Sequence, residues 1–217
     1  MNELLLLAAT SFVVGFSGAL MPGPMLVAVI LQSTKRGYLT GPLVVVGHAT
    51  LEAATIIALY FGLSTIIGST AAKVALGILG GGFLLWMGFD LFKYAKKASL
   101  RLEAEGGQAR LLSYGPVLSG VATSAMNPYF FVWWALVGNG FIWQALGIAG
   151  LIGVVIFAWA HWMSDLSWYT FISVSIHKGR RFLSDRVYGL VLAVCGIFLL
   201  AVSITFIYDG LRALFQI

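Results

Sequence analysis

Two stretches of the sequence decide the expected fold: SGALMPGP at residues 17–24 and SGVATSAMNP at residues 119–128. Each stretch places Ser-Gly shortly before a proline, inside a long apolar run. Proline lacks the backbone donor that a helix interior needs, and its ring clashes with the preceding turn. Both stretches therefore predict a broken helix, and their places in the two halves of the chain predict a repeated architecture.

The composition around these breaks is that of a membrane protein. Of the 217 residues, 60% are hydrophobic and only 10% are charged, whereas a soluble domain carries about 25% charged residues. Apolar runs long enough to cross a bilayer, which takes about 20 helical residues, predict an all-α membrane protein with six transmembrane helices. The six runs are Leu4–Leu31, Thr40–Ile67, Val74–Phe92, Leu111–Gly138, Ala145–Val174 and Val187–Ile207.

The two halves also share the order of their polar residues. In each half the second span carries a histidine with an acid four residues later, and the third span ends with an acid three residues before a base. These pairs are His48 with Glu52, His161 with Asp165, Asp90 with Lys93, and Asp209 with Arg212. A repeat with an odd number of spans inserts upside down relative to its twin, as in many secondary transporters. We therefore expect two inverted three-helix repeats with broken first helices, at residues 1–94 and 113–217, joined by a cytoplasmic linker at residues 95–112.

The broken helices are candidates for a solute path. In hydrocarbon a freed backbone carbonyl costs several kcal/mol unless another group binds it, so breaks are tolerated where they line a polar cavity. Plain kinks are the alternative, because proline is common in membrane helices, but matching breaks in two halves favour a site near the middle of the membrane. The residues expected on this path are Pro22, Gly23, Pro24, Asn127, Pro128 and Tyr129.

The histidine–acid pairs are the sharpest chemical feature. A spacing of four residues puts both members of a pair on one helix face. A charged acid in the middle of a membrane costs about 3 kcal/mol, so such residues are functional by default, although structural hydrogen bonds between helices are the alternative. Histidine titrates near neutral pH and suits proton exchange. Because inverted second spans run in opposite directions, residue depth predicts that His48 faces Asp165 and that Glu52 faces His161.

The order and spacing of these motifs resemble one family, the LysE-type translocators, which comprise lysine, homoserine and threonine exporters. The matching residues are Pro22-Gly23-Pro24, Gly47-His48 with Glu52, and Asn127-Pro128. The resemblance covers nearly the whole chain and implies secondary active export of an amino acid or similar small metabolite, driven by the proton or membrane-potential gradient. Many members carry a lysine after Asn-Pro. The chain instead has Tyr129 and resembles an Asn-Pro-Tyr branch, so the specificity of the other members does not carry over.

Other classes of protein compete with this interpretation. Two histidines and two carboxylates can supply four ligands for a divalent metal, so a metal-ion exporter is the second hypothesis. An enzyme is not expected, because Ser164, His161 and Asp165 on a single helix make a poor triad. Nucleic acid is not expected as a partner, since the basic residues are dispersed between apolar runs, and no cofactor is expected. The expected partners are a small-molecule solute and the lipid bilayer, and the glycines of residues 77–81 predict close helix approach or a homodimer contact.

The basic residues predict the orientation of a multi-pass protein in the cell membrane. If the six spans alternate, only Lys73 and Arg212 of the thirteen Lys and Arg residues fall on one side. Positive residues stay cytoplasmic, so both termini are expected outside.

This topology can be tested by labelling single cysteines in a Cys195→Ser background. Asn2→Cys should react with a membrane-impermeant maleimide in intact cells, whereas Lys97→Cys should react only after lysis. Labelling of Lys97→Cys in intact cells would contradict the predicted orientation.

Overall fold

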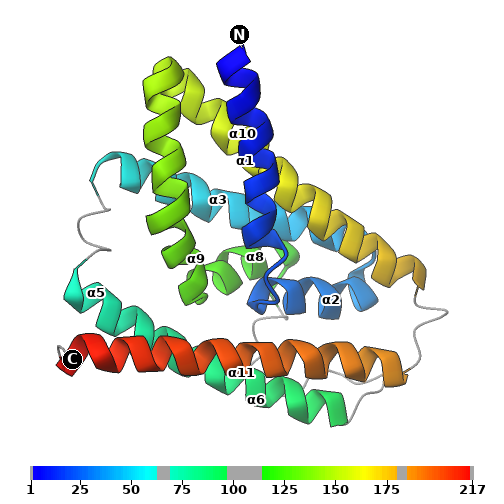
Figure 1. The fold of residues 1–217 in the computed structure, drawn as a ribbon. Helices are drawn as coiled ribbons and strands as arrows, with labels where there is room; N and C mark the ends of the chain where they lie inside the picture. The colour runs from blue at the N-terminus through cyan, green and yellow to red at the C-terminus, as the bar shows by residue number, and fades with distance from the viewer. Residues whose placement is uncertain (1, 63–68, 97–113, 180–184, 216–217) are drawn as a thin grey trace.

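The computed structural model describes residues 2–62, 69–96, 114–179 and 185–215, and these residues form helices with no strand among them (Figure 1). The helices of the first half are α1 (Asn2–Ala19), α2 (Pro24–Arg36), α3 (Thr40–Tyr60), α5 (Thr70–Ala75), η1 (Leu76–Gly80) and α6 (Gly81–Lys96). Those of the second half are α8 (Pro116–Ala125), α9 (Pro128–Trp133), η2 (Trp134–Gly138), α10 (Asn139–Gly179) and α11 (Asp185–Phe215). The segments η1 and η2 are short π-helical turns within longer helices. The linker predicted at residues 95–112 lies almost wholly outside the described residues.

Both predicted breaks are present. The chain leaves the helix between α1 and α2 and again between α8 and α9. Pro24 and Pro128 each occupy the first turn of the new helix, where the missing N–H would have no partner in any case. The side chain of Asn127 caps α9, because its Oδ1 accepts a hydrogen bond from the N–H of Tyr129 at 3.1 Å. The prolines therefore start new helices rather than bend continuous ones.

The boundary between the fourth and fifth spans differs from the prediction. The runs at residues 111–138 and 145–174 predict a connection around Asn139, but one helical stretch continues from residue 128 to residue 179. This stretch reverses at Ala149 and Gly150, as the hairpin in Figure 1 shows. Gly150 has a φ of 58°, which glycine adopts without the clash of a Cβ. Residues 139–144 contain neither a charge nor a proline, so nothing in them ends the helix.

The described residues contain five helical stretches that are long and apolar enough to cross a membrane. One of them is the hairpin of residues 128–179, and each of its two arms is long enough to supply a crossing. Large apolar side chains face outward, with Phe61 80% exposed and Leu5 72% exposed, as expected of positions that face lipid. The chain is an all-α, multi-pass membrane protein, whereas the count of six spans and the inverted repeat stay predictions.

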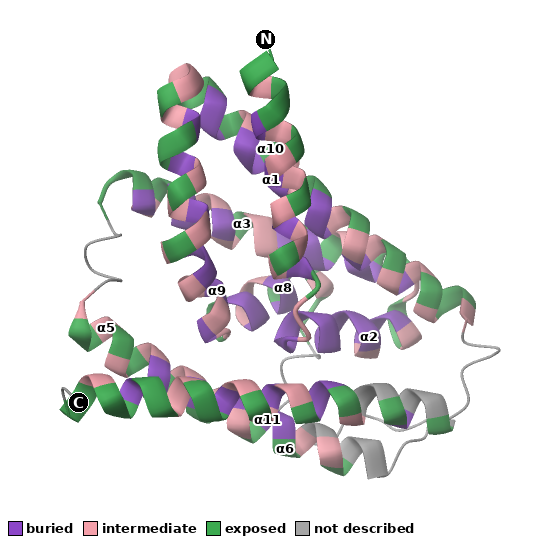
Figure 2. Ribbon diagram, in the orientation of Figure 1, coloured by how far each residue is buried: buried purple, intermediate pink, exposed green. Residues whose placement is uncertain are grey.

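Helices of the first half pack mainly against helices of the second half. Helix α1 packs on α10, α8 packs on α3, and α6 packs on α11. Glycines bring these helices close: a Cβ at Gly47 would meet the carbonyl oxygen of Val117, and a Cβ at Gly120 would meet that of Val44. Helices α3 and α8 thus touch backbone to backbone, as small residues permit in membrane helices. Figure 2 shows that α2, which lies near these contacts, is buried along most of its length.

The glycines of residues 77–81 make contacts within the chain. Gly77 lies against Gly210, and Gly81 lies against Ile207, both on α11. These glycines therefore provide the close helix approach that the sequence predicts. The homodimer stays a prediction, without support from these residues.

The backbone contact between α3 and α8 predicts the effect of adding one methyl group. Gly47→Ala and Gly120→Ala should each lower the free energy of unfolding in detergent by about 1–3 kcal/mol, because the added Cβ has no room. Gly82→Ala is the matched control, since a Cβ there would meet nothing within 4 Å. Denaturant-induced unfolding monitored by circular dichroism measures the difference. Equal stability of Gly82→Ala and Gly120→Ala would refute the close contact.

Candidate functional site

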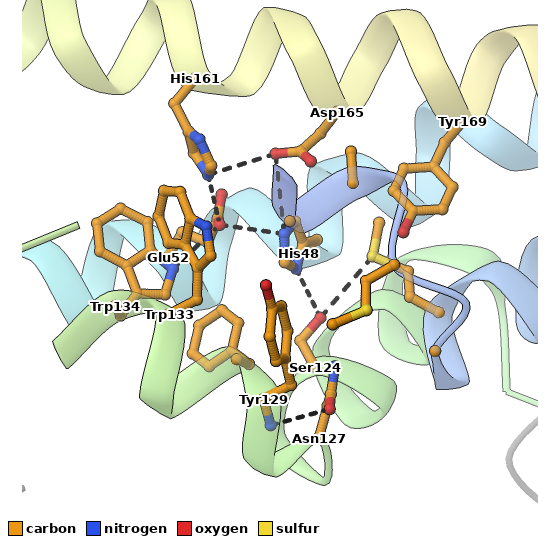
Figure 3. A pocket seen from close by; sticks show the side chains of 16 residues that line it. His48, Glu52, Ser124, Asn127, Tyr129, Trp133, Trp134, His161, Asp165 and Tyr169 are labelled. Atoms are coloured by element: carbon orange, nitrogen blue, oxygen red, sulfur yellow. Dashed lines mark hydrogen bonds and ion pairs between the residues drawn. The ribbon is translucent and has the colours of Figure 1, made fainter. Parts of the chain in front are cut away.

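A small cavity lies where the two breaks meet the two histidine-bearing helices (Figure 3). Its walls come from α1, the α1–α2 break and α3 on one side, and from α8, α9 and α10 on the other. The cavity has a volume of about 50 Å³, which is room for a few water molecules. Both halves of the chain therefore contribute to one central site.

The four ionisable residues singled out by the sequence come together in this cavity. Across the halves, Glu52 Oε1 lies 3.0 Å from His161 Nε2, and His48 Nε2 lies 3.9 Å from Asp165 Oδ2. Within each helix, the contacts are 3.1 Å from His48 to Glu52 and 3.5 Å from His161 to Asp165. Of the two crossed pairs expected from residue depth, Glu52 with His161 is within hydrogen-bond distance, whereas His48 lies closer to Glu52 than to Asp165. Both acids and His161 are buried, and the His48 side chain is only 12% exposed.

Glu52 is held by donors of fixed direction. The indole N–H of Trp134 donates to Glu52 Oε1 at 3.1 Å, and an indole nitrogen can only donate. His161 Nε2 lies at 3.0 Å from the same oxygen, while His161 Nδ1 has no hydrogen-bond partner in the described part of the chain. The proton of His161 is therefore assigned to Nε2, where it donates. Glu52 Oε1 accepts two hydrogen bonds inside a buried site.

Ser124 bonds to one nitrogen of His48. The Ser124 hydroxyl lies 2.7 Å from the carbonyl oxygen of Gly120 and 2.6 Å from His48 Nδ1. We assign the hydroxyl proton to the bond with Gly120, so that the Ser124 oxygen accepts from His48 Nδ1. The other nitrogen of His48, Nε2, then faces Glu52 and Asp165. A bare nitrogen against two ionised carboxylates would bury acceptors without donors, which is costly. With this assignment the contact requires a proton, held by His48 or by one of the two carboxyl groups.

Aromatic side chains close the site around His161. The ring of Trp133 stacks on the imidazole with centroids 4.7 Å apart and an angle of 24° between the planes. The indole N–H of Trp133 donates to Ser17 Oγ at 3.0 Å, which joins α9 to α1. Trp134 meets the imidazole edge-on at 5.4 Å. This shell keeps lipid away from the buried charges and fixes the position of the imidazole.

The residues predicted to lie on the solute path divide into two groups. Gly23, Asn127 and Tyr129 line the central cavity. A Cβ at Gly23 would lie 3.5 Å from Asn127 Nδ2, so the two breaks are in contact with each other. The prolines Pro22, Pro24 and Pro128 line neither this cavity nor the larger one described below. Pro24 and Pro128 stand at helix starts and are themselves buried, so they act on the backbone and not on the cavity wall.

The cluster also has donors that suit a divalent metal. His48, Glu52 and Asp165 each offer a ligand atom, and these three atoms lie within 4.8 Å of one another. Glu52 Oε2 and Asp165 Oδ2 are buried and have no hydrogen-bond partner in the described residues. A mixed set of imidazole and carboxylate ligands suits zinc or manganese. The residues therefore fit a metal ion as well as protons.

Sequence reasoning missed several residues of the site. Ser124 precedes the second break by three residues, and its place within the stretch of residues 119–128 was the available signal. Trp134 carries the hydrogen bond to Glu52, yet the sequence favours membrane belts and packing as the reason for its aromatic residues. Met25 and Tyr169 also line the cavity, and no pattern in the sequence marks either of them.

Comparison with known proteins gives one match. The model of the LysE type translocator family matches residues 16–210, which span both breaks, both histidine–acid pairs and most of the chain. No curated protein and no solved structure gives a significant match.

The role of Ser124 predicts a change in the tautomer of His48. In the wild type, ¹⁵N NMR of labelled histidine should show a protonated Nδ1 on His48, because Ser124 accepts from it. Ser124→Ala should release a population in which Nδ1 is bare. Ser167→Ala is the matched control, since Ser167 makes the same type of bond, to the carbonyl of Met163 at 2.6 Å, outside the cluster. A bare Nδ1 on His48 in the wild type would contradict this assignment.

Proposed function

Since the chain belongs to the LysE type translocator family, whose members export amino acids or similar small molecules, we propose that it is a secondary active exporter driven by proton exchange. The observation that carries proton coupling is the contact of His48 Nε2 with Glu52 and Asp165 at 3.1 and 3.9 Å. With the Nδ1 proton of His48 assigned to the bond with Ser124, this contact needs a further proton, and the site lies at the meeting point of the two breaks.

The charge of the cluster explains why protons and solute would move against each other. With both carboxyl groups ionised and both histidines neutral, the cluster carries two negative charges in a buried site. An uncompensated charge in the membrane interior is costly. Two bound protons remove the charge, and so does a positively charged group of a solute combined with one proton. Solute and proton are therefore alternative means of neutralising the same residues.

The surroundings of the cluster suit the two ends of an amino acid. An ammonium group would be attracted to Glu52 and Asp165. A carboxylate would be attracted to the N-terminal end of α2, which carries partial positive charge. Gly23 caps this end and lines the cavity beside Asn127. Half-helix ends of this kind hold carboxylates of solutes in other transporters with discontinuous helices.

A divalent metal ion is the second candidate solute, and the three ligand atoms of His48, Glu52 and Asp165 favour it. The two candidates differ in what they displace. A metal ion would replace protons on both carboxyl groups and on His48, whereas an amino acid would need only the charge of its ammonium group to be matched. Transport assays with both classes of solute separate them.

Neutral replacements in the cluster test proton coupling. In proteoliposomes containing a pH-sensitive dye, the wild type should give a proton signal when an amino acid from a panel moves down its gradient. Glu52→Gln and Asp165→Asn should abolish the proton signal and the accumulation driven by a pH gradient, while exchange of labelled for unlabelled solute survives. The physical reason is that the neutral amide can neither bind nor release the coupled proton.

The matched control is Asp90→Asn, which makes the same chemical change in a carboxyl group on α6, outside the cluster. It should leave the proton signal intact. Transport of an amino acid by the wild type with no proton movement would refute the coupling. A proton signal with zinc or manganese but with no amino acid would make the chain a metal exporter.

A further inference from the structure

A second and much larger cavity lies beside the central one. Its volume is about 730 Å³, within the range of about 300–1,000 Å³ that small-molecule sites occupy. Its walls come from α5 and η1, from α9 and η2, and from the C-terminal part of α11. Helix α5 contacts α11 along this region, and the two lie next to each other in Figure 1. The central cavity, at about 50 Å³, is too small for an amino acid in this conformation, whereas the second cavity is large enough.

Two side chains separate the cavities. Met21, in the break between α1 and α2, and Tyr129, at the start of α9, line both of them. In Figure 3 the Tyr129 ring rises from α9 toward Glu52 and His48. Its hydroxyl makes a long contact of 3.4 Å with the carbonyl oxygen of Ser17. A solute that leaves the charged cluster past these two side chains enters the second cavity directly.

The lining of the second cavity has two opposite charges on an otherwise largely apolar wall. Lys73 comes from α5 and Asp209 from α11. Neither Lys73 nor Asp209 forms a salt bridge with another residue in the described part of the chain. Asn139 also lines the cavity, and its Oδ1 is buried without a hydrogen-bond partner in the described residues. The apolar part of the wall includes Val132, Leu136 and Phe206.

We propose that the second cavity is a binding site for the transported solute as a zwitterion with an apolar side chain, in which Lys73 takes the carboxylate and Asp209 takes the ammonium group. The proposal rests on the proposed export of an amino acid and deepens it by naming the class of solute. Lys73 lies on the side that the basic residues predict to be outside, so the cavity is the site that the solute occupies before release.

The chemistry of the wall favours a zwitterion over a lipid chain. A lipid tail would fill the apolar part but would leave the buried amide oxygen of Asn139 without a partner, which is costly. It would also make no use of the exposed charges of Lys73 and Asp209. A zwitterionic solute satisfies both charges at once and can donate to Asn139 Oδ1 from its ammonium group. Its side chain then meets the apolar wall. One type of molecule therefore accounts for all three features.

The first test is transport of L-valine into proteoliposomes, with its methyl ester and N-acetylvaline as competitors that each lack one charge. Lys73→Gln and Asp209→Asn should each raise the KM for L-valine about fivefold, because each removes one exposed charge contact, with little change in the maximal rate or in protons moved per valine. Lys73→Gln should lose discrimination against the methyl ester, and Asp209→Asn should lose it against N-acetylvaline. Lys93→Gln, a matched change near the C-terminal end of α6 and outside the cavity, should leave the KM unchanged.

The second test measures occupancy without transport. In a Cys195→Ser background, the reaction of Ala135→Cys with a maleimide should be slowed by L-valine and not by N-acetylvaline methyl ester. Leu151→Cys, whose parent side chain is 64% exposed and lies outside the cavity, should react at the same rate with or without L-valine. Equal protection by the uncharged derivative would make the cavity a lipid-like cleft and overturn the proposal.

The outcomes separate this site from the proposed function. If the wild type transports L-valine with protons but neither charge variant changes the KM, the second site is wrong and the exporter stands. If the wild type transports lysine or glutamate but not L-valine, the class of solute is wrong. If no amino acid is transported, the exporter and the second site fail together.

Discussion

The cost of holding four ionisable side chains inside an apolar protein is the constraint on which the rest of this structure depends. Glu52, His161 and Asp165 are 2–3% exposed, and removing the partner from a buried charge costs several kcal/mol. Helices α3 and α10 therefore approach until Glu52 lies 3.0 Å from His161 and His48 lies 3.9 Å from Asp165. Trp134 donates to Glu52, and Ser124 forms a hydrogen bond with His48. The aromatic rings around His161 then exclude lipid from a site that could not tolerate contact with it.

The helix breaks and the glycines are what allow this approach. Because α8 ends at Ala125, it is short enough to lie across α3, and Gly47 and Gly120 let the two backbones touch. This contact brings Ser124 to His48. On the other side, Gly15 of α1 lies against Ser164 and His161 of α10. A glycine thus again allows a helix of one half to approach a helix of the other half closely. The prolines contribute indirectly, since they fix where α2 and α9 begin and hence where Gly23 and Asn127 meet.

The sequence predicts the parts of this arrangement that depend on periodicity and chemical cost. Long apolar runs predict the helices, proline stretches predict the breaks, and residue depth predicts that His48 faces Asp165 and Glu52 faces His161. It misses features that depend on tertiary packing. The reversal at Ala149 and Gly150 lies in a run with neither charge nor proline, and only the positive φ of Gly150 marks it. The sequence does not distinguish Ser124 from other small residues, because its contact with His48 depends on the packing of α8 on α3. The sequence places the prolines on the solute path because it does not distinguish a proline at a helix start from a proline at a kink.

The close contacts also restrict how the central cavity can open. Backbone contacts join α8 to α3, whereas contacts between α3 and α10 near the cluster are made by side chains, namely the crossed histidine–acid pairs. The exception is Gly41 at the start of α3, where a Cβ would meet the carbonyl of Tyr169 on α10. An opening that kept both backbone contacts would therefore have to separate the crossed pairs. If these pairs carry the proposed coupled protons, protonation and opening act on the same contacts, because a proton that strengthens a crossed pair also holds α3 and α10 together.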